Sequence, residues 1–460
     1  MKLFSENDNY KLYNGSMLDM LEVVEKNSID SIVTDPPYEL GFMNKGWDSS
    51  GIAFQKETWE KCFEVLKPGG YLLAFGGSRT FHRIACAIED AGFEIRDTIL
   101  WLYGSGFIKS MNIALQFDKE EGLQGQRGLG GFNVAGMGAQ ESRDAILYTR
   151  KAATEAGNGA YTEPKGENAK KWFGWGTAIK PAYEPVIVAR KPLDGSTTNN
   201  LKKYGVGGLN LDECRIGNET RTYKNQSLKK PEGAGCFRDD NWIPKEYEKT
   251  VSGRIPSNVI LTYDETDFDE VCGGMPVGGK NGNITKNYKM NNQVYGEYGY
   301  CNTFDAYEDS GSAARYFYCA KASTKDRDEG LEEFEKVVDC DRHLDCDKNS
   351  DYHSANTPIN RTAVAKRNTH PTVKPTELMQ YLIRLVTPNG GTILDPFNGS
   401  GSTGKAAMWE NRERKKGYKY IGIEITESYL PIARARIEYA LVAPTEEQQE
   451  QIPGQMSLFD

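Results

Sequence analysis

The sequence of 460 residues predicts an α/β fold in which one parallel sheet is assembled from both ends of the chain. Short apolar strands alternate with helices of apolar periodicity between residues 10 and 101, and the same alternation returns between residues 377 and 439. The long stretch between these two regions lacks it. Strand–helix alternation is typical of parallel sheets, in which a helix connects each strand to the next. The sequence therefore predicts one α/β domain that is divided by an insert.

The first part of the predicted domain occupies residues 1–190. Residues 10–13 are expected to form a strand, Asn14-Gly15-Ser16 a turn, and residues 29–34 the next strand. Helices are then expected at 58–66 and 81–91, with strands at 71–75, 94–101 and 185–190. Glycine and polar residues dominate from 104 to 170, which predicts a mobile loop within this part.

The insert is predicted at residues 191–365, where short strands, turns and basic residues occur without sustained helices. The second part of the α/β domain follows at 366–440, and an acidic tail at 441–460 completes the chain. Helices are expected at 377–386, 402–409 and 427–439, with strands at 392–394 and 420–423. The first strand of this part can lie beside the N-terminal strands in one sheet.

Composition indicates a cytoplasmic protein and is compatible with a nucleic-acid partner. No apolar run approaches the ~18 residues of a membrane helix, and nine scattered cysteines fit a reducing compartment. The net charge is −9, but residues 326–351 carry eleven acids and four bases, and residues 441–460 carry four acids and no bases. The acidity is therefore concentrated, and the rest of the chain can present a local basic face.

The first motif is Asp35-Pro36-Pro37-Tyr38, which follows the apolar strand at 29–34. Two prolines fix two φ angles and remove two N–H donors, so Asp35 is held at the carboxyl end of a strand. A rigid acceptor beside an aromatic ring is suited to binding a planar ring through its exocyclic amine. A plain turn with a core tyrosine is the alternative that these four residues leave open.

The second motif runs from Asp395 to Gly404 and lies between a strand and a helix. Its glycines satisfy the G-x-G-x-x-G pattern, and Glu424 lies where a ribose-binding acid is expected, so an NAD-dependent oxidoreductase is an alternative. Asp395 argues against it, because its charge would face a pyrophosphate; a carboxylate there is better suited to a cationic ligand such as S-adenosylmethionine. The chain after Glu424 is also too short for the second half of a dinucleotide fold.

With these two motifs, the segment Thr369–Pro375 makes the chain resemble the DNA amino-methyltransferases, which methylate adenine N6 or cytosine N4. The order of the motifs is similar to the circularly permuted β class, and residues 97–109 and 172–185 resemble a phage and prophage subgroup. The resemblance implies a Rossmann-like, S-adenosylmethionine-dependent methyltransferase sheet with a target-recognition region at 191–365. It also implies a bacterial or phage-encoded cytoplasmic enzyme, of the kind found in restriction–modification systems, that acts on double-stranded DNA.

The resemblance assigns roles to residues of the motifs. Tyr38 would stack on a base flipped out of the duplex, while Asp35 and the Pro36 carbonyl would accept hydrogen bonds from its amine. The residues expected to be catalytic are Asp35, Pro36, Pro37 and Tyr38. Those expected to bind the cofactor are Ser16, His370, Thr372, Lys374, Asp395, Pro396, Phe397, Asn398, Gly399, Ser400, Gly401 and Glu424. The expected DNA contacts are Lys202, Lys203, Arg215, Lys229, Lys230 and Arg254.

The motif Asp35–Tyr38 favours adenine N6 as the target, with cytosine N4 as the alternative. A cytosine-C5 enzyme would need a nucleophilic Pro-Cys pair, which this chain lacks. Asp35 in place of asparagine disfavours relatives that methylate protein glutamine. A catalytically silent DNA-binding relative is a further alternative, and the intact motifs argue against it.

Three weaker patterns remain. Cys340, His343, Cys346 and His353 have spacings loosely compatible with zinc, but the dense acids around them favour an acidic surface loop, and no metal is expected. The segment Gln455–Phe459 resembles the peptide by which bacterial replication and repair proteins bind the sliding clamp. Trp172 and Trp175 are expected to pack rather than contact bases. The recognition sequence, a partner nuclease and the oligomeric state are left open.

Overall fold

The computed structural model describes residues 1–40, 46–103, 110–123, 164–225, 247–262, 291–292, 296–297, 318–319, 324–337 and 366–443. The chain divides into two compact units. The first comprises Met1–Glu213, Asn258–Tyr263 and Cys319–Asp460, and the second comprises Cys214–Ser257 and Asp264–Tyr318. Residues 191–213 of the predicted insert therefore belong to the first unit.

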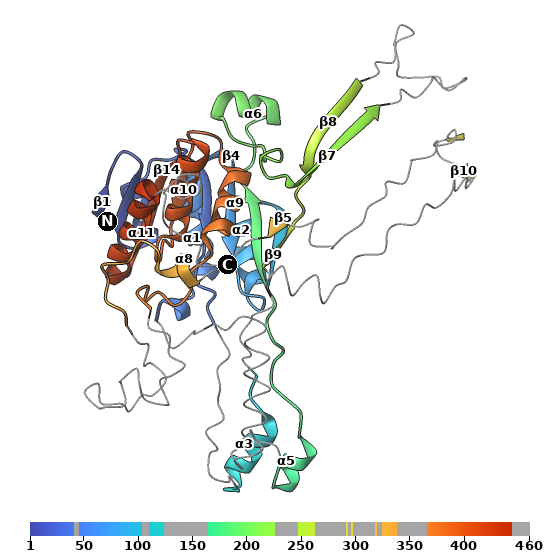
Figure 1. Cartoon of the computed structure of the whole chain (residues 1–460), viewed down its shortest axis with the longest axis vertical. Coiled ribbons are helices and arrows are strands. Elements are labelled where there is room, and N and C mark those ends of the chain that lie inside the picture. Colours follow the sequence, from blue (N-terminus) through green and yellow to red (C-terminus); the bar gives the residue numbers. More distant parts are fainter. Residues whose placement is uncertain are drawn as a thin grey trace, which may run out of the picture. The chain divides into compact units, whose positions relative to one another are not determined.

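The first unit is built on a ten-stranded sheet, which confirms the predicted α/β fold (Figure 1). The strand order is β1-β2-β14-β13-β3-β4-β6-β5-β9-β12. The strands are β1 (Lys2–Glu6), β2 (Tyr10–Asn14), β3 (Ile29–Thr34), β4 (Leu66–Phe75), β5 (Glu94–Tyr103), β6 (Tyr183–Arg190), β9 (Val259–Thr262), β12 (Tyr318–Cys319), β13 (Thr392–Asp395) and β14 (Lys419–Glu424).

The centre of the sheet joins the two ends of the chain. Strand β3 pairs in parallel with β13, and Ser31 lies opposite Ile393. Strand β14 pairs in parallel with both β13 and β2. Because parallel strands end at the same edge of a sheet, the Asp35 motif and the Asp395 loop emerge side by side. One domain is thus made from both ends of the chain, as the sequence predicts.

The sheet is mixed, whereas strand–helix alternation predicts a parallel one. Strand β6 runs antiparallel to both β4 and β5, and β1 runs antiparallel to β2. The segment before β6 returns from the region beyond β5, so β6 enters from the opposite edge. As a result the beginning of β6, including Glu184, lies at the edge where β4 and β5 end.

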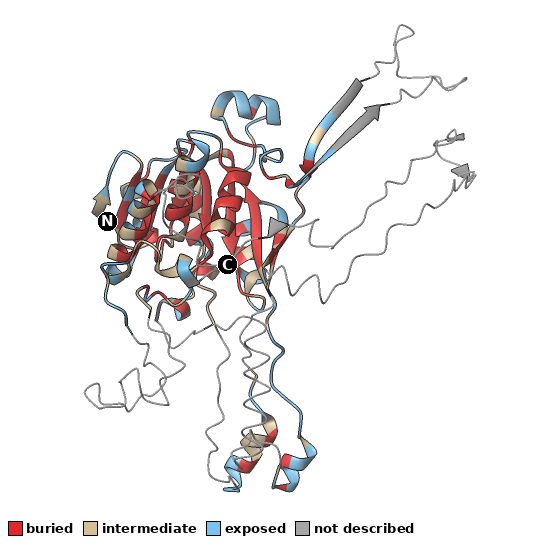
Figure 2. Ribbon diagram, viewed as in Figure 1, coloured by how far each residue is buried: buried red, intermediate tan, exposed pale blue. Residues whose placement is uncertain are grey.

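Two groups of helices pack against the sheet. In one group α10 contacts both α9 and α11, and in the other α1 contacts α2 and the 3₁₀ helix η1. The helices are η1 (Met17–Glu22), α1 (Lys56–Val65), α2 (Phe81–Asp90), α9 (Thr376–Val386), α10 (Ser402–Arg414) and α11 (Leu430–Val442). Figure 2 shows the central strands and their facing helices as buried. Trp59, fully buried on α1, packs into the core with Ile32 of β3, so this core fixes the strand that carries Asp35.

Further elements depart from the sequence-based expectations. Helices α3 (Ile113–Glu120) and α5 (Glu167–Lys171) lie in the stretch expected to be loop. Helix α6 (Thr197–Tyr204) begins at the Ser196 cap, whose hydroxyl accepts a hydrogen bond from the Asn199 amide. Strand β9 joins the main sheet beside β5, although the sequence places it in the insert. Short helices also occur at η3 (Gly46–Ser49), η4 (Ile52–Phe54), α8 (Thr324–Asp328) and η7 (Glu427–Tyr429).

The second unit contains a hairpin of β7 (Ile216–Asn225) and β8 (Tyr247–Arg254), paired antiparallel. Gly253 has a φ of +74°, and a Cβ there would lie 2.6 Å from the Gly217 carbonyl oxygen. A smaller pair is formed by β10 (Asn291–Asn292) and β11 (Gly296–Glu297). Across the described parts of both units, no helix combines the length and apolar character required to cross a membrane.

Candidate active site

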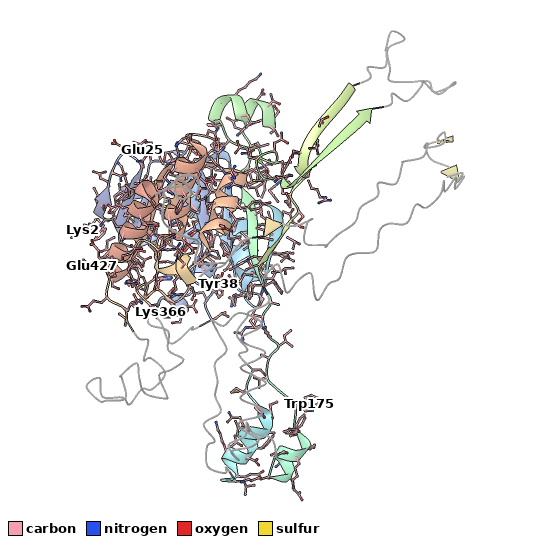
Figure 3. All side chains as sticks on the ribbon, in the orientation of Figure 1. Lys2, Glu25, Tyr38, Trp175, Lys366 and Glu427 are labelled. Carbon is pink, nitrogen blue, oxygen red and sulfur yellow. The ribbon has the colours of Figure 1, made fainter. Side chains whose placement is uncertain are left out.

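A cavity of about 1240 Å³ opens where β3, β13 and β14 end and β6 begins. Both sequence motifs line it, together with the segment His370–Lys374 and the turn that holds Ser16. Figure 3 shows Tyr38 at the lower edge of the α/β domain, the edge where Lys366 is also labelled. The structure thus brings together side chains that lie more than 300 positions apart in the sequence.

Asp35 is the acid at the floor of this cavity. Its Oδ2 accepts a hydrogen bond from Lys374 Nζ at 2.6 Å. Its Oδ1 is buried and has no hydrogen-bond partner among the described residues, although the side chain as a whole is 19% exposed. Burial raises the pKa of Asp35, and the Lys374 ammonium opposes that rise. An unpartnered acceptor at the start of a stiff Pro-Pro turn can bind an incoming N–H donor.

Glu184 completes the polar cluster beside Asp35. Its Oε2 accepts a hydrogen bond from the Tyr38 hydroxyl at 2.8 Å, and its Oε1 accepts one from the Tyr103 hydroxyl at 3.3 Å. Lys374 Nζ lies 3.4 Å from Glu184 Oε2 and 5.3 Å from the centre of the Tyr38 ring. Burial would lower the pKa of Lys374, but Asp35 and Glu184 outweigh burial and raise it. Lys374 therefore stays charged.

Asp395 holds the strands that flank the cavity. Its Oδ1 accepts hydrogen bonds from the Thr34 hydroxyl at 2.7 Å and the Phe397 amide at 3.1 Å, and its Oδ2 accepts one from the Thr403 hydroxyl at 2.6 Å. The residue is 2% exposed, and burial raises its pKa to about 6. Its carboxylate therefore ties β3, β13 and α10 together while it faces the cavity wall.

The glycine loop is held by Glu424, the last residue of β14. Glu424 Oε2 accepts a hydrogen bond from the Gly399 amide at 2.7 Å, and Oε1 accepts one from the Thr426 amide at 2.7 Å. Burial raises the pKa of Glu424. Each carboxylate oxygen has a second lone-pair direction, so Glu424 can also accept hydroxyl donors from a ligand in the cavity.

The segment before the glycine loop packs directly onto it. Gly399 has a φ of +51°, and a Cβ there would lie 2.8 Å from His370 Nε2, so only glycine fits. His370 Nδ1 lies 3.0 Å from the Thr372 carbonyl oxygen, and its ring stacks edge-on against Tyr429 at 4.6 Å. Burial lowers the pKa of His370 to about 3, so the imidazole is neutral.

Polar contacts from β14 and α11 fix the remaining loop residues. Asn398 Oδ1 accepts a hydrogen bond from the Tyr420 hydroxyl at 2.7 Å. The fully buried Arg436 donates from Nη1 to the Ser400 carbonyl at 2.8 Å and to the Ser400 hydroxyl at 3.1 Å. Pro396 and Phe397 line the cavity, and the Phe397 ring lies 6.4 Å from that of Trp59. These contacts pre-form the loop.

Ser16 also lines the cavity, but its hydroxyl caps helix η1. It accepts a hydrogen bond from the Leu18 amide at 3.2 Å, as an N-cap residue does. The sequence-based expectation that Ser16 binds a cofactor stays a prediction.

A nucleoside cofactor with a charged amino-acid end fits this cavity by its donor set. Glu424 supplies acceptors for hydroxyls at the glycine loop, and the unpartnered Asp35 Oδ1 leaves an acceptor in the same cavity for the group that is to be modified. Thr372 and Lys374 line the same space. The Lys374 ammonium contacts Asp35 and Glu184 in this structure, so its expected role toward a cofactor carboxylate also stays a prediction.

The expected DNA contacts are distributed over both units. Lys202 and Lys203 lie exposed on α6, and Lys203 pairs with Asp194 at 2.6 Å. Arg215 and Arg254 belong to the second unit, where Arg215 donates to the Gly253 carbonyl at 3.3 Å. Lys229 and Lys230 lie outside the described residues, as does the segment Gln455–Phe459.

Two other sequence patterns can be placed in part. The rings of Trp172 and Trp175 pack edge-on at 5.1 Å, and Trp175, labelled in Figure 3, is 60% exposed. Cys340, His343, Cys346 and His353 lie outside the described residues. Within the ranges that the structure describes, no group of three or more His, Cys, Asp or Glu side chains could hold a metal ion.

Sequence reasoning missed Glu184, Tyr103 and Arg436. Each makes contacts across the fold rather than along the chain. Tyr103 and Glu184 lie in the segments 97–109 and 172–185, whose resemblance to a subgroup assigned them no role. A buried arginine such as Arg436 gives no signal in the sequence of α11, where it reads as an ordinary surface charge.

Residues 29–435 match the family model N6_N4_Mtase, described as DNA methylase. The type II methyltransferase M.HpaI of Haemophilus parainfluenzae is 33% identical over 115 residues, which cover 24% of this chain and 36% of that protein. The type II methyltransferase M.HindIII of Haemophilus influenzae is 20% identical over 241 residues, which cover 43% of this chain and 64% of that protein. The chain thus spans less than two thirds of these relatives.

Solved structures that match this chain do so at low sequence identity and low TM-score. The crystal structure of M1.HpyAVI is 12% identical, with a TM-score of 0.35 over 93% of this chain and 98% of that chain. The PvuII DNA methyltransferase, titled cytosine-N4-specific, is 13% identical, with a TM-score of 0.38 over 94% of this chain and 86% of that chain.

Proposed function

We propose that this chain, which belongs to the N6_N4_Mtase family of DNA methylases, transfers a methyl group from S-adenosylmethionine to the exocyclic N6 amine of an adenine in duplex DNA. The observation that carries the proposal is the buried, unpartnered Oδ1 of Asp35, which shares a cavity with the glycine loop. A methylase of amines needs an acceptor of this kind, because the nitrogen lone pair is delocalised into the base.

Asp35 and Pro36 act on the target amine. Asp35 accepts one N–H bond and the Pro36 carbonyl accepts the other, which favours a tetrahedral nitrogen with an available lone pair. S-adenosylmethionine, when bound, supplies an electrophilic methyl group on a sulfonium. Asp35 would hold the amine toward that methyl group and is placed to accept the proton that the amine loses on methylation, because burial raises the pKa of Asp35. Catalysis is then mostly positioning and electrostatics.

Tyr38 and Pro37 form the wall against which the target base rests. A base inside a duplex cannot reach the cavity, so it is flipped out at a cost of about a few kcal/mol. Stacking on an aromatic ring contributes about 1–3 kcal/mol per base and offsets part of that cost. The Tyr38 hydroxyl is held by Glu184, so the ring is oriented before the base arrives.

The cofactor is held by the glycine loop and by Glu424. Glu424 would accept hydrogen bonds from the ribose hydroxyls, and the loop from Asp395 to Gly401 would hold the methionine end. His370 and Thr372 close the site from the preceding segment. The order of the motifs in the chain supports the permuted β class, and the segments 97–109 and 172–185 support the phage and prophage subgroup.

Cytosine N4 is the second candidate target. The Asp-Pro-Pro-Tyr form of the motif favours adenine, while the reacting group in both bases is an exocyclic amine that Asp35 would bind in the same way. Target recognition is assigned to residues 191–365, with phosphate or base contacts from the six basic residues named above. Binding of a sliding clamp through Gln455–Phe459 is a separate part of the proposal, and a pull-down with residues 453–460 deleted tests it.

The test of the main proposal is methyl transfer from labelled S-adenosylmethionine to unmethylated duplex DNA. We expect N6-methyladenine from the wild type, and a loss of about 10²-fold or more in kcat for Asp35→Ala with cofactor affinity retained. Asp30→Asn is the matched control, because Asp30 lies on the same strand at the opposite end and pairs with Lys67 at 2.6 Å. It should retain activity near that of the wild type.

The products decide between the alternatives. N4-methylcytosine would keep the mechanism and overturn the choice of base. A wild type that binds no S-adenosylmethionine, or an Asp35→Ala variant as active as the wild type, would overturn the proposal.

A further inference from the structure

One ammonium is shared by two carboxylates beside the proposed target-base site. Lys374 Nζ lies 2.6 Å from Asp35 Oδ2 and 3.4 Å from Glu184 Oε2. The Nζ atom also lies 5.0 Å from the centre of the Phe75 ring and 5.3 Å from that of Tyr38. Lys374 is 7% exposed, so its charge cannot be left to solvent. It must keep at least one carboxylate partner.

The present pairing weakens the acceptor that the proposed reaction needs. The Lys374 ammonium occupies Oδ2 of Asp35, while Oδ1 of the same carboxylate is left for the target amine. An ammonium on Oδ2 also withdraws electron density from the whole carboxylate, which makes Oδ1 a poorer acceptor. If the ammonium left Asp35 with no other partner, an uncompensated buried charge would remain, which is strongly unfavourable.

Glu184 is already placed to take over this ion pair. The two tyrosine hydroxyls that donate to it fix both of its oxygens, at 2.8 Å from Tyr38 and 3.3 Å from Tyr103. Glu184 is the second residue of β6 and lies opposite Trp101 of β5, so the sheet fixes its backbone. A carboxylate held in this way can receive the ammonium without a large rearrangement.

We propose that Glu184 is a positioning residue that accepts Lys374 when the target base enters, so that Asp35 is released for the amine. This inference rests on the proposed function. In the free enzyme Lys374 neutralises Asp35, and in the DNA complex it neutralises Glu184. The Tyr38 hydroxyl stays on Glu184 in both states, which couples the stacking ring to the movement of the lysine. Glu184 touches neither the base nor the cofactor.

The first test removes the charge of the Glu184 side chain and keeps its shape. In Glu184→Gln the ammonium loses its second carboxylate and stays on Asp35, so the base must compete with it. We expect the KM for DNA to rise about tenfold, corresponding to the loss of one modest charge contact. The fluorescence gain of 2-aminopurine placed at the target position should fall in parallel. The Kd for S-adenosylmethionine without DNA should stay within about twofold of the wild type.

Matched variants separate this role from a structural one. Glu94→Gln removes an ion pair with Arg190 at the opposite end of the same pair of strands, and it should change neither KM nor base flipping. Glu184→Asp keeps the charge and should lie between the wild type and Glu184→Gln. Thermal melting checks that each variant is folded.

The decisive measurement is rescue by removing the lysine. In the double variant Glu184→Gln with Lys374→Met, no ammonium competes for Asp35, so at saturating cofactor, and at a pH where Asp35 is ionised, the KM for DNA should fall below that of Glu184→Gln. A double variant with a KM as high as that of Glu184→Gln would overturn the inference. So would a parallel loss of cofactor affinity in Glu184→Gln. Absence of methyl transfer by the wild type would instead count against the proposed function, and base flipping and cofactor binding are measured independently of it.

Discussion

At the scale of single residues, two aspartates at adjacent strand ends have opposite environments. Asp395 accepts three hydrogen bonds from Thr34, Phe397 and Thr403, and it is almost completely buried. Asp35 keeps one oxygen without a partner in the described structure. A satisfied carboxylate holds a structure together, whereas an unsatisfied one is available to a ligand. The same residue type therefore serves as an anchor at one strand end and as an acceptor at the next.

The anchor predicts a specific pH dependence of stability. The pKa of Asp395 rises from 3.8 to about 6 on folding, so the folded protein binds more protons than the unfolded chain between these values. This group therefore makes the free energy of unfolding fall as pH rises through that window. Asp395→Asn removes the titration. The free energy of unfolding of the wild type minus that of the variant should be about 1.4 kcal/mol larger at pH 5 than at pH 7.5.

Urea unfolding of both proteins at the two pH values measures this difference directly. Contributions from all other titrating groups cancel in the comparison. A difference that does not change with pH would contradict the raised pKa.

At the scale of elements, α10 connects the glycine loop to the rest of the domain. It packs against β14 and α11 at Gly404, and its buried Lys405 pairs with Asp326 at 2.6 Å and with Glu329 at 2.8 Å. Asp326 lies on α8, directly after a stretch outside the described residues, and also accepts hydrogen bonds from Thr376. One helix thus positions the loop at its N-terminus and fastens the segment that returns from the insert.

The packing of α10 predicts the cost of adding one methyl group. A Cβ at Gly404 would lie 2.5 Å from Tyr420 and 2.6 Å from Ile437. Overpacking costs about 1–3 kcal/mol, and the better helix propensity of alanine recovers up to about 1 kcal/mol. Gly404→Ala should therefore lower the free energy of unfolding by about 1–2 kcal/mol.

Gly208→Ala is the matched control for this prediction. A Cβ at Gly208 would have no atom within 4 Å, so its stability should match the wild type within about 0.5 kcal/mol. Chemical denaturation curves compare the three proteins. Equal stability of Gly404→Ala and the wild type would show that Tyr420 and Ile437 yield at little cost.

At the scale of the whole molecule, the distribution of charge bears on the proposed binding of DNA by an acidic protein. The acids are concentrated in two segments of the chain, while α6 presents neighbouring lysines at the surface. Lys203 is paired with Asp194 and lies over the Tyr204 ring, whereas Lys202 has no ion pair in the part of the chain that the structure describes. These two lysines differ in environment although they are adjacent.

This difference predicts unequal contributions to DNA binding. Each phosphate contact contributes about 0.9 to the slope of log K against log salt concentration. Lys202→Ala should lower the magnitude of that slope by about 0.9, and Lys203→Ala should lower it by less, because Asp194 already neutralises Lys203. Fluorescence anisotropy with labelled duplex over a range of salt concentrations measures both slopes. Equal slopes for wild type and Lys202→Ala would remove α6 from the DNA interface.

The sequence by itself determined the α/β domain, its assembly from both ends of the chain and the place of the two motifs. Periodicity located the strands that carry Asp35 and Asp395, and parallel pairing then required their ends to share one edge. These features depend on local patterns and on general rules of sheet topology. The antiparallel entry of β6 and the helix α3 were not predicted, because glycine-rich polar sequence carries little periodic signal.

Only the tertiary structure decided how the charges of the site are paired. Lys374 and Asp35 lie 339 positions apart, and Glu184 reaches both from a third segment. Sequence patterns report which residues share a strand or helix, but not which side chains from distant elements meet at a common edge. Burial then sets the pKa values and the hydrogen-bond partners, since both depend on everything that surrounds a group in three dimensions.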